Sequence, residues 1–244
     1  MNHEIILKKA LPNQKTVVIL GNARSGTSLI SGILTKMGIS MDSQYGKPDK
    51  YAPKGYYESE EAHSINTQIF KLAWDNKVQF DLDAHFYPPP YEKILQQADA
   101  VKKDIITFIN NFSNCNIWGF KNPKTSLTAE LFLPYLNDPH FIILLRNPVS
   151  NAKAINKIYR IPFLKAMEIT SYYNFIISRI CVKHNIPKLF INFEQMRIEP
   201  NVIVKEILRF LDLNISEEIM RDINSVIVSG YSTTGNDSTY STQK

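Results

Sequence analysis

The residues with the clearest chemical potential lie in the segment VVILGNARSGTSLISGIL, residues 17–34. Gly21 and Gly26 stand at the spacing of the phosphate-binding pattern G-x-x-x-x-G-K-[ST], and Ser28 closes it, but Thr27 occupies the lysine position. Backbone N–H groups of such a turn bind anions ahead of a helix, because unpaired donors and the helix dipole both favour negative charge there. The segment therefore predicts an anion site without the lysine that reaches the β- and γ-phosphates of a nucleoside triphosphate.

Arg24 supplies a cation at a different point of this segment, which favours a smaller phosphate group. The stretch GNARSGTSLI resembles the 5'-phosphosulfate loop of sulfotransferases, which binds 3'-phosphoadenosine 5'-phosphosulfate (PAPS) without a metal. The resemblance implies that a run of loop residues holds the 5'-phosphate and the sulfonate. These residues are Arg24, Ser25, Gly26, Thr27 and Ser28.

A second stretch, LLRNPVSNAKAI at residues 144–155, is similar to the 3'-phosphate motif of the same family, in which a strand runs into Arg-Asn-Pro and then a helix. The resemblance implies a forked contact between the guanidinium of Arg146 and the 3'-phosphate. The family normally has a serine eight residues after this arginine, where this chain has Ala154. Ser150 is the nearby hydroxyl, and it is our candidate for the same ligand group.

Two more stretches extend the resemblance. Residues 188–213 look like the family's strand followed by YEDL and a proline-started helix, with Phe193 where tyrosine is usual. Residues 118–127, WGFKNPKTSL, resemble the strand end that carries Lys-Thr-His in the cytosolic branch. Lys121 matches the lysine that touches the sulfonate, but Pro123 occupies the base position and cannot accept a proton.

The base is therefore expected elsewhere. The stretch PKGYYESEEAHSIN, residues 53–66, resembles the Gly-Tyr-aromatic-Glu segment of the bacterial branch, which commonly uses a glutamate. We expect Glu58 to act as the base, because the tyrosines around it can desolvate a carboxylate and raise its pKa. Arg24 and Lys121 would supply positive charge to the departing phosphate. The rivals for the base are Glu61 and His63, although Glu60 and Glu61 are equally typical of the acidic first turn of a helix.

Short apolar runs alternate with helical periodicity along the chain, which predicts strands over 16–20, 117–120, 140–145 and 188–193. Helices are expected over about 27–37, 59–73, 91–112, 125–136, 163–184, 201–211 and 216–228, and another after Arg-Asn-Pro. This order predicts an α/β, three-layer, P-loop-like fold with a central, mainly parallel sheet flanked by helices. We expect one sulfotransferase-like domain over residues 1–228 and a polar, mobile tail over 229–244.

Two further segments carry expectations. In the helix over 163–184, one side is expected to pack into the core, and it carries Leu164, Met167, Ser171, Phe175, Ser178 and Val182. The proline-rich stretch 81–93 is expected to be extended and to line a binding mouth.

Composition limits the function classes. The chain has 244 residues, 44% of them hydrophobic, and a net charge of +5, which suits anionic ligands but comes without the basic runs of a nucleic-acid-binding protein. Two cysteines without CxxC spacing and five scattered histidines predict no metal site. No apolar run approaches the roughly 18 residues of a membrane span, and the N-terminus lacks the features of a signal peptide, so a cytoplasmic protein is expected.

Together these observations predict an enzyme, a PAPS-dependent sulfotransferase that acts without a metal on a hydroxyl or amine of a small molecule, sugar or lipid. Two alternatives stay open. One is a P-loop kinase, which the spacing of Gly21 to Ser28 permits. The other is a degenerate, non-catalytic nucleotide-binding protein, because Ala154 and Phe193 weaken the expected grip on the 3'-phosphate.

Overall fold

Five strands form one central sheet in the computed structural model, which describes residues 5–42, 55–75 and 87–231. The strands are β1 (Lys15–Leu20), β2 (Ser40–Asp42), β3 (Ile117–Lys121), β4 (Pro139–Leu145) and β5 (Lys188–Asn192). Their order across the sheet is β2-β3-β1-β4-β5, and every neighbouring pair is parallel. The predicted α/β class with a parallel sheet is confirmed.

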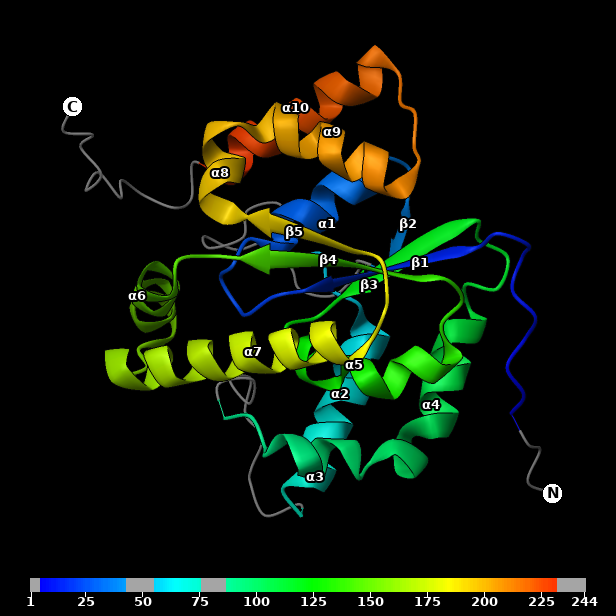
Figure 1. Ribbon diagram of the computed structural model, residues 1–244, viewed down its shortest axis with the longest axis vertical. Helices are drawn as coiled ribbons and strands as arrows, with labels where there is room; N and C mark the ends of the chain where they lie inside the picture. Colours follow the sequence, from blue (N-terminus) through cyan, green and yellow to red (C-terminus); the bar gives the residue numbers. More distant parts are fainter. Residues whose placement is uncertain (1–4, 43–54, 76–86, 232–244) are drawn as a thin grey trace.

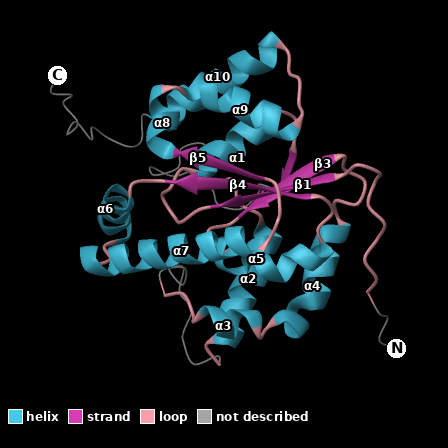
Figure 2. Cartoon of the chain, in the orientation of Figure 1, coloured by secondary structure: helices cyan, strands magenta, loops and turns pink. Residues whose placement is uncertain are grey.

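Helices cover both faces of this sheet, as Figures 1 and 2 show. The helices drawn above the sheet in Figure 1 are α1 (Thr27–Lys36), α8 (Phe193–Ile198), α9 (Pro200–Leu211) and α10 (Glu217–Tyr231). Those drawn below it are α2 (Glu60–Ala73), α3 (Tyr91–Leu95), α4 (Ala98–Asn110), α5 (Thr125–Phe132) and α7 (Phe163–Lys183). Helix α6 (Pro148–Tyr159) follows the end of β4, and a 3-10 turn, Leu133–Tyr135, follows α5.

Two apolar layers hold these helices to the sheet, and β1 contributes to both. Successive strand residues point to opposite faces. Val18 and Leu20 join the layer packed by α2, α4, α5 and α7, whereas Val17 and Ile19 join the layer packed by α1, α9 and α10. Burial on both faces explains why β1 reads as an uninterrupted apolar run.

Three local features differ from the predicted elements. Strand β2 is too short to produce a periodic pattern and was not predicted. The helix predicted over 91–112 is two helices, interrupted where Gln97 takes φ −88° and ψ 5°. The last predicted strand ends one residue early, because the side chain of Asn192 accepts a hydrogen bond from the N–H of Gln195 and starts α8.

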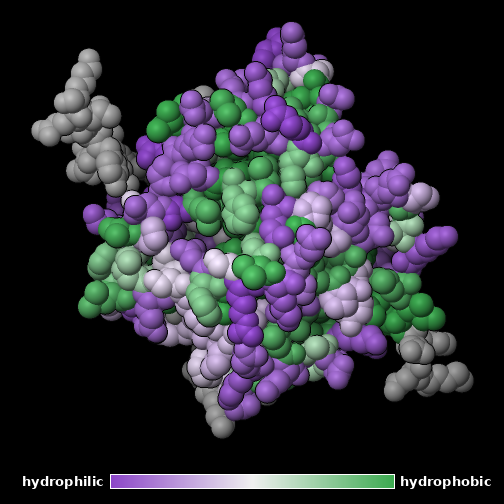
Figure 3. Space-filling view, viewed as in Figure 1, coloured by the Kyte–Doolittle hydropathy of each residue, from purple (hydrophilic) through white to green (hydrophobic). Residues whose placement is uncertain are grey.

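The side of α7 that packs into the core is opposite to the predicted side. Leu164, Phe175 and Val182 are 79%, 62% and 89% exposed. The buried side consists of Ala166, Ile169, Thr170, Tyr173, Ile176, Ile177 and Ile180. Both sides are apolar, so periodicity alone could not choose between them, and apolar side chains lie among polar ones on the surface drawn in Figure 3.

The remaining expectations fall at the edges of the described chain. Helix α10 reaches Tyr231, so the first residues of the predicted tail are helical, and residues 232–244 lie outside the described part. Of the proline-rich stretch, 81–86 lie outside it, and Pro90 precedes α3. In the described ranges no helix has the length and apolar character to cross a membrane.

Candidate active site

The carboxyl ends of β1, β3 and β4 meet at one edge of the sheet, with β1 in the middle. After β1 the chain builds β2 and β3 on one side and then crosses to β4 on the other. The loop after β1 therefore lies at the switch point where parallel α/β sheets bind ligands. The strand ends deliver the predicted residues Lys121 from β3 and Arg146 from β4 to this loop.

The loop between β1 and α1 is a tight turn closed by its own groups. The N–H and the Oγ of Ser25 both donate to the carbonyl oxygen of Asn22, at 3.2 and 2.7 Å. The N–H of Gly21 donates to Ser126 Oγ at 2.8 Å, and that hydroxyl donates back to the carbonyl of Gly21 at 3.0 Å. Both the N–H and the O–H of Ser25 are therefore used within the turn, so this residue shapes the loop, and the donors for a ligand come from the residues after it.

A buried amide network fixes the loop from outside. Asn22 Nδ2 donates to Asn151 Oδ1 at 2.9 Å and to Thr170 Oγ1 at 3.2 Å. Asn151 Nδ2 donates to the carbonyl of Ala23 at 2.9 Å. A satisfied polar network in a low-dielectric interior is rigid, so α6 and α7 hold the loop in one conformation.

Helix α1 starts directly behind this loop with Gly26 as its N-cap, at φ 100° and ψ 6°, and no side chain caps it in the described chain. Its first N–H groups lack helical partners and are available to an anion. A Cβ on Gly26 would lie 2.5 Å from Cδ2 of Phe193, and Arg24 also has a positive φ of 66°. The turn thus requires glycine at position 26 for both space and backbone geometry.

Arg146 and Phe193 close the loop from the side of β4 and β5. Arg146 Nη1 donates to the carbonyl of Arg24 at 2.7 Å, and its guanidinium carbon lies 4.7 Å from the centroid of the Phe193 ring. The N–H of Asn147 donates to Glu194 Oε1 at 3.0 Å. These contacts bring both predicted arginines to the same loop.

The predicted serine lies at a second helix start. Ser150 is in the first turn of α6, and its N–H donates to Asn147 Oδ1 at 3.0 Å. Ala154 lies one turn further along α6. Helix α6 therefore begins close behind Arg146, just as α1 begins close behind the glycine loop.

Lys121 joins the loop to the predicted base. Its side chain is only 1% exposed, and Nζ donates to Glu58 Oε1 at 3.0 Å, to the carbonyl of Tyr56 at 2.7 Å and to Ser28 Oγ at 3.2 Å. Burial lowers the pKa of Lys121, the Glu58 carboxylate opposes that shift, and Arg24 adds to it. All three donors of the ammonium are used, as a buried cation requires.

Glu58 faces the end of β3 because its segment is pinned there. Its Oε2 accepts from Asn122 Nδ2 at 2.9 Å, and the N–H of Ser59 donates to the carbonyl of Lys121 at 3.2 Å. Tyr57 takes φ 50°, an unusual conformation for an aromatic residue. An ammonium and an amide are the polar partners of Glu58, so its environment is not the purely tyrosine-lined one expected from the sequence.

The two rival bases occupy different places. Glu61 points toward α4, where Asn111 Nδ2 donates to both of its carboxylate oxygens at 3.1 and 3.0 Å. Burial raises the pKa of Glu61, and Asp42 contributes to the shift. This rival therefore makes its contacts away from Lys121.

His63 instead lies beside the Glu58 partner. Its Nδ1 is 3.3 Å from Asn122 Nδ2. Asn122 Oδ1 accepts from the N–H of Lys124 at 3.1 Å, so Nδ2 is the donor and His63 Nδ1 accepts. Burial lowers the pKa of His63 to about 4, Lys124 adds to the shift and Glu58 opposes it. The ring is therefore neutral at pH 7, with its proton on Nε2.

Sequence reasoning missed the amides that hold this site. Asn122 directly follows Lys121 at a strand end, which is where site residues gather in parallel sheets. Asn22 lies inside the glycine segment, but its contacts with Asn151 and Thr170 span 129 and 148 residues and left no local signal. In the described ranges no group of three or more His, Cys, Asp or Glu could hold a metal ion.

Comparison with known proteins now adds independent evidence. The model of a family described as the sulfotransferase family matches residues 16–217. No curated protein matches the chain at a significant level. The fold is similar to the sulfotransferase domain of the Synechococcus PCC 7002 olefin synthase (TM-score 0.56, 15% identity, covering 88% of this chain and 78% of that one).

A second similar structure is sulfotransferase STF9 from Mycobacterium avium, with a TM-score of 0.54 and 12% identity over 93% of this chain and 70% of that one. At these identities the two structures support the fold alone. The family model covers most of the chain, including the glycine loop, Glu58, Lys121 and Arg146. This protein therefore belongs to the sulfotransferase family.

Proposed function

We propose that this chain transfers a sulfonate group from PAPS to a hydroxyl or amine acceptor by metal-independent, in-line transfer. One observation carries the proposal. A glycine loop with helix-start amides and a fully buried ammonium, itself paired with a carboxylate, meet at one sheet edge. An anion site beside a potential proton acceptor is what sulfuryl transfer needs.

The residues present fit such a donor. The uncapped start of α1 and the guanidinium of Arg24 suit a 5'-phosphosulfate, and Arg146 with the first turn of α6 suits a 3'-phosphate. Thr27 and Ser28 stand at the head of α1, where their backbone N–H groups serve the same anion. The donor supplies the transferable sulfonate, and these residues bind and orient it.

The chain's own groups then divide the reaction. As the acceptor oxygen forms its bond to sulfur, the bond between sulfur and the phosphate oxygen breaks, and the acceptor proton passes to the Glu58 carboxylate. Both carboxylate oxygens already accept one hydrogen bond, and each retains another lone-pair site for that proton. Lys121 and Arg24 stabilise the charge that grows on the departing phosphate.

Two alternatives make different demands. A P-loop kinase requires Mg²⁺ and a cation near the γ-phosphate, and Thr27 in the lysine position disfavours it. A non-catalytic nucleotide-binding protein is favoured by Ala154, which lacks the hydroxyl that the family places there. It requires no transfer at all.

The test is transfer of radiolabelled sulfonate from PAPS to a panel of hydroxyl and amine acceptors in the presence of EDTA. We expect a labelled acceptor whose formation EDTA does not slow. Transfer of γ-phosphate from ATP that EDTA abolishes would instead support the kinase. Tight binding of 3'-phosphoadenosine 5'-phosphate (PAP) without any labelled product would support the non-catalytic alternative.

A further inference from the structure

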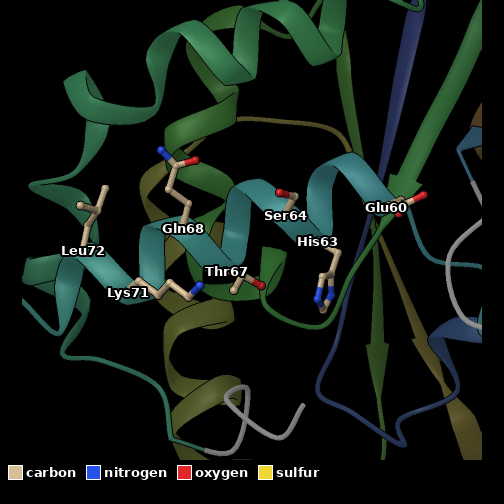
Figure 4. Close-up of a pocket in the computed structure, with 7 residues that line it drawn as sticks. All are labelled: Glu60, His63, Ser64, Thr67, Gln68, Lys71 and Leu72. Carbon is tan, nitrogen blue, oxygen red and sulfur yellow. The ribbon is translucent and has the colours of Figure 1, made fainter. Parts of the chain in front are cut away.

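A pocket of about 390 Å³ opens along α2, the helix that begins two residues after Glu58. Its size falls within the range of small-molecule sites. The lining residues, drawn as sticks in Figure 4, are Glu60, His63, Ser64, Thr67, Gln68, Lys71 and Leu72. Six of the seven carry a polar group, while carbon atoms of these side chains supply most of the pocket surface.

Two contacts connect a lining residue of the pocket to the predicted base. His63 lines the pocket, and its Nδ1 lies 3.3 Å from Asn122 Nδ2. The same Asn122 nitrogen donates to Glu58 Oε2 at 2.9 Å. The side chains of His63 and Asn122 therefore link the pocket to the carboxylate that would accept the acceptor's proton.

The floor of the pocket is polarised by a buried cation. Lys124 is 3% exposed, and its Nζ donates to Thr67 Oγ1 at 3.0 Å. Because the oxygen of Thr67 accepts this bond, its own proton is oriented to donate elsewhere. His63 carries its proton on Nε2, and its neutral form persists at pH 7 because burial holds its pKa near 4. The hydroxyl of Thr67 therefore favours an oxygen acceptor in a ligand.

The two ends of the pocket carry opposite charges along α2. Glu60 lies at one end, and Lys71 lies three helical turns away, with its side chain reaching back along the helix toward Thr67 in Figure 4. An anionic group is repelled at the Glu60 end and attracted at the Lys71 end. The turn between Thr67 and His63 sets a spacing of about 5.4 Å between an oxyanion and a hydroxyl near Glu58.

We propose that this pocket is the acceptor subsite, and that it selects a hydroxyl compound carrying a carboxylate or phosphate about 5 to 6 Å from the reacting oxygen. The inference rests on the proposed function, because it identifies the second substrate of that reaction. Lys71 and Thr67 hold the anionic group, and His63 lies at the hydroxyl end. A hydroxy acid the size of a uronic acid fits this description.

The test uses matched pairs of probes and does not require turnover. The protein, labelled with ¹⁵N and saturated with PAP so that its phosphate sites are occupied, is titrated with glucuronate or glucose, and with glycerol 3-phosphate or glycerol. We expect saturable shifts of the His63 ring nitrogens with the charged member of at least one pair. The affinity should exceed that of its neutral partner by about tenfold, the worth of one charge-assisted hydrogen bond.

Variants assign the effect to the pocket. Lys71→Gln and Thr67→Val should each abolish the preference for the charged probe, whereas Thr67→Ser keeps the hydroxyl and should retain it. Lys205→Gln removes an exposed lysine from α9, on the opposite side of the sheet, and controls for net charge. Since Lys71 is exposed, its variant tests the proposal even if Thr67→Val fails to fold.

The inference fails if neither charged probe shifts His63, if charged and neutral probes bind equally, or if Lys71→Gln leaves the preference intact. These outcomes differ from failure of the proposed function. That failure appears in separate measurements, as absence of PAP binding before any acceptor is added or as absence of sulfonate transfer from PAPS to every acceptor of the panel.

Discussion

The two halves of the candidate site are built in different ways. The glycine loop offers backbone N–H groups at the start of α1, and its side chains mostly point inward to hold the turn. The Glu58 centre is made of side-chain charges from separate segments, with Lys121, Asn122 and His63 around one carboxylate. Under the proposed function, donor binding and proton transfer would therefore be separable, because the first depends on backbone geometry and the second on side-chain charge.

The largest expected effect separates the two halves most clearly. Glu58→Gln should lower turnover by about 10² to 10⁴, the usual worth of a general base, while the affinity for PAP changes little. Steady-state kinetics with saturating donor and calorimetry with PAP measure the two quantities. An unchanged turnover would remove Glu58 from the mechanism.

A control is needed because Glu58→Gln also removes the partner of a buried ammonium. Urea unfolding of Glu58→Gln, Lys121→Met and the double variant gives the coupling between the two side chains. Stability should recover in part in the double variant, because no unpaired ammonium is left buried, while turnover stays low because both groups are missing. If Glu58→Gln and the double variant are equally unstable, the unpaired ammonium is not the cause of the stability loss.

The loop should fail through its backbone rather than its charge. Gly26→Ala places a Cβ 2.5 Å from the Phe193 ring at φ 100°, so we expect a loss of about 2 to 5 kcal/mol of unfolding free energy, together with weaker PAP binding. Gly38→Ala is the matched control, because its φ is also positive at 85° but its Cβ would meet no atom within 4 Å. The excess loss in Gly26→Ala over Gly38→Ala measures the clash.

The clash also has a rescue. Adding Phe193→Ala to Gly26→Ala should restore part of the stability that the clash costs. If the double variant is as unstable as the sum of the single variants, the contact between these positions does not set the shape of the loop.

The charge of Arg24 should affect donor binding more than proton transfer to Glu58. Arg24→Ala should weaken PAP binding by about 10- to 100-fold, the worth of charge-assisted hydrogen bonds, with the smaller effect on turnover at saturating donor. Arg160→Ala controls for the loss of an arginine at positive φ, since Arg160 has φ 58° at the end of α6. An unchanged dissociation constant in Arg24→Ala would argue against the loop as the donor site.

The smallest expected effect is the contribution of His63, beside the Glu58 centre, to the free energy of unfolding at low pH. The pKa of His63 is about 4 in the folded protein against 6.5 for an ordinary histidine. Between these pH values the unfolded chain binds more protons, so stability should fall as pH is lowered through this window. From pH 6.5 to pH 5 we expect a loss of about 1 to 2 kcal/mol attributable to this residue.

Urea unfolding of the wild type and of His63→Gln at both pH values measures that contribution. Glu58 and Lys124 face the ring and are present in both proteins, so the difference between the two pH dependences isolates the histidine. Identical pH dependences would show that the ring is not buried against Asn122 and Lys124.

The glycine loop and the Glu58 centre also differ in how far the sequence predicts them. The loop could be read from the sequence because β1, the glycines and the start of α1 are consecutive, and local spacing fixes backbone geometry. The charged centre could be named in part: Glu58 and Lys121 were identified by resemblance, but the ion pair between them joins positions 63 residues apart. Asn122 and Lys124 belong to this centre only because the fold brings the two segments together, so no local sequence pattern marks them.

The fold shows the same limit. Strands buried on both faces were predicted within a residue or two, because their apolar runs are continuous. The orientation of α7 was not, since apolar side chains occupy both of its sides and the sheet decides which side is buried. Tertiary packing determines that the isoleucine-rich side is buried, and a periodic pattern carries no information about that packing.

The proposed function requires that the backbone amides of the glycine loop, with Arg24 and Arg146, bind a 3'-phosphorylated adenosine nucleotide without metal. This requirement can be measured by calorimetric titration of the wild-type protein with PAP in EDTA, alongside adenosine 5'-phosphate and ATP with Mg²⁺. We expect PAP to bind in EDTA, and at least about tenfold more tightly than adenosine 5'-phosphate, since Arg146 would add a forked contact to the 3'-phosphate. Absence of PAP binding, or tighter binding of ATP with Mg²⁺, would contradict it.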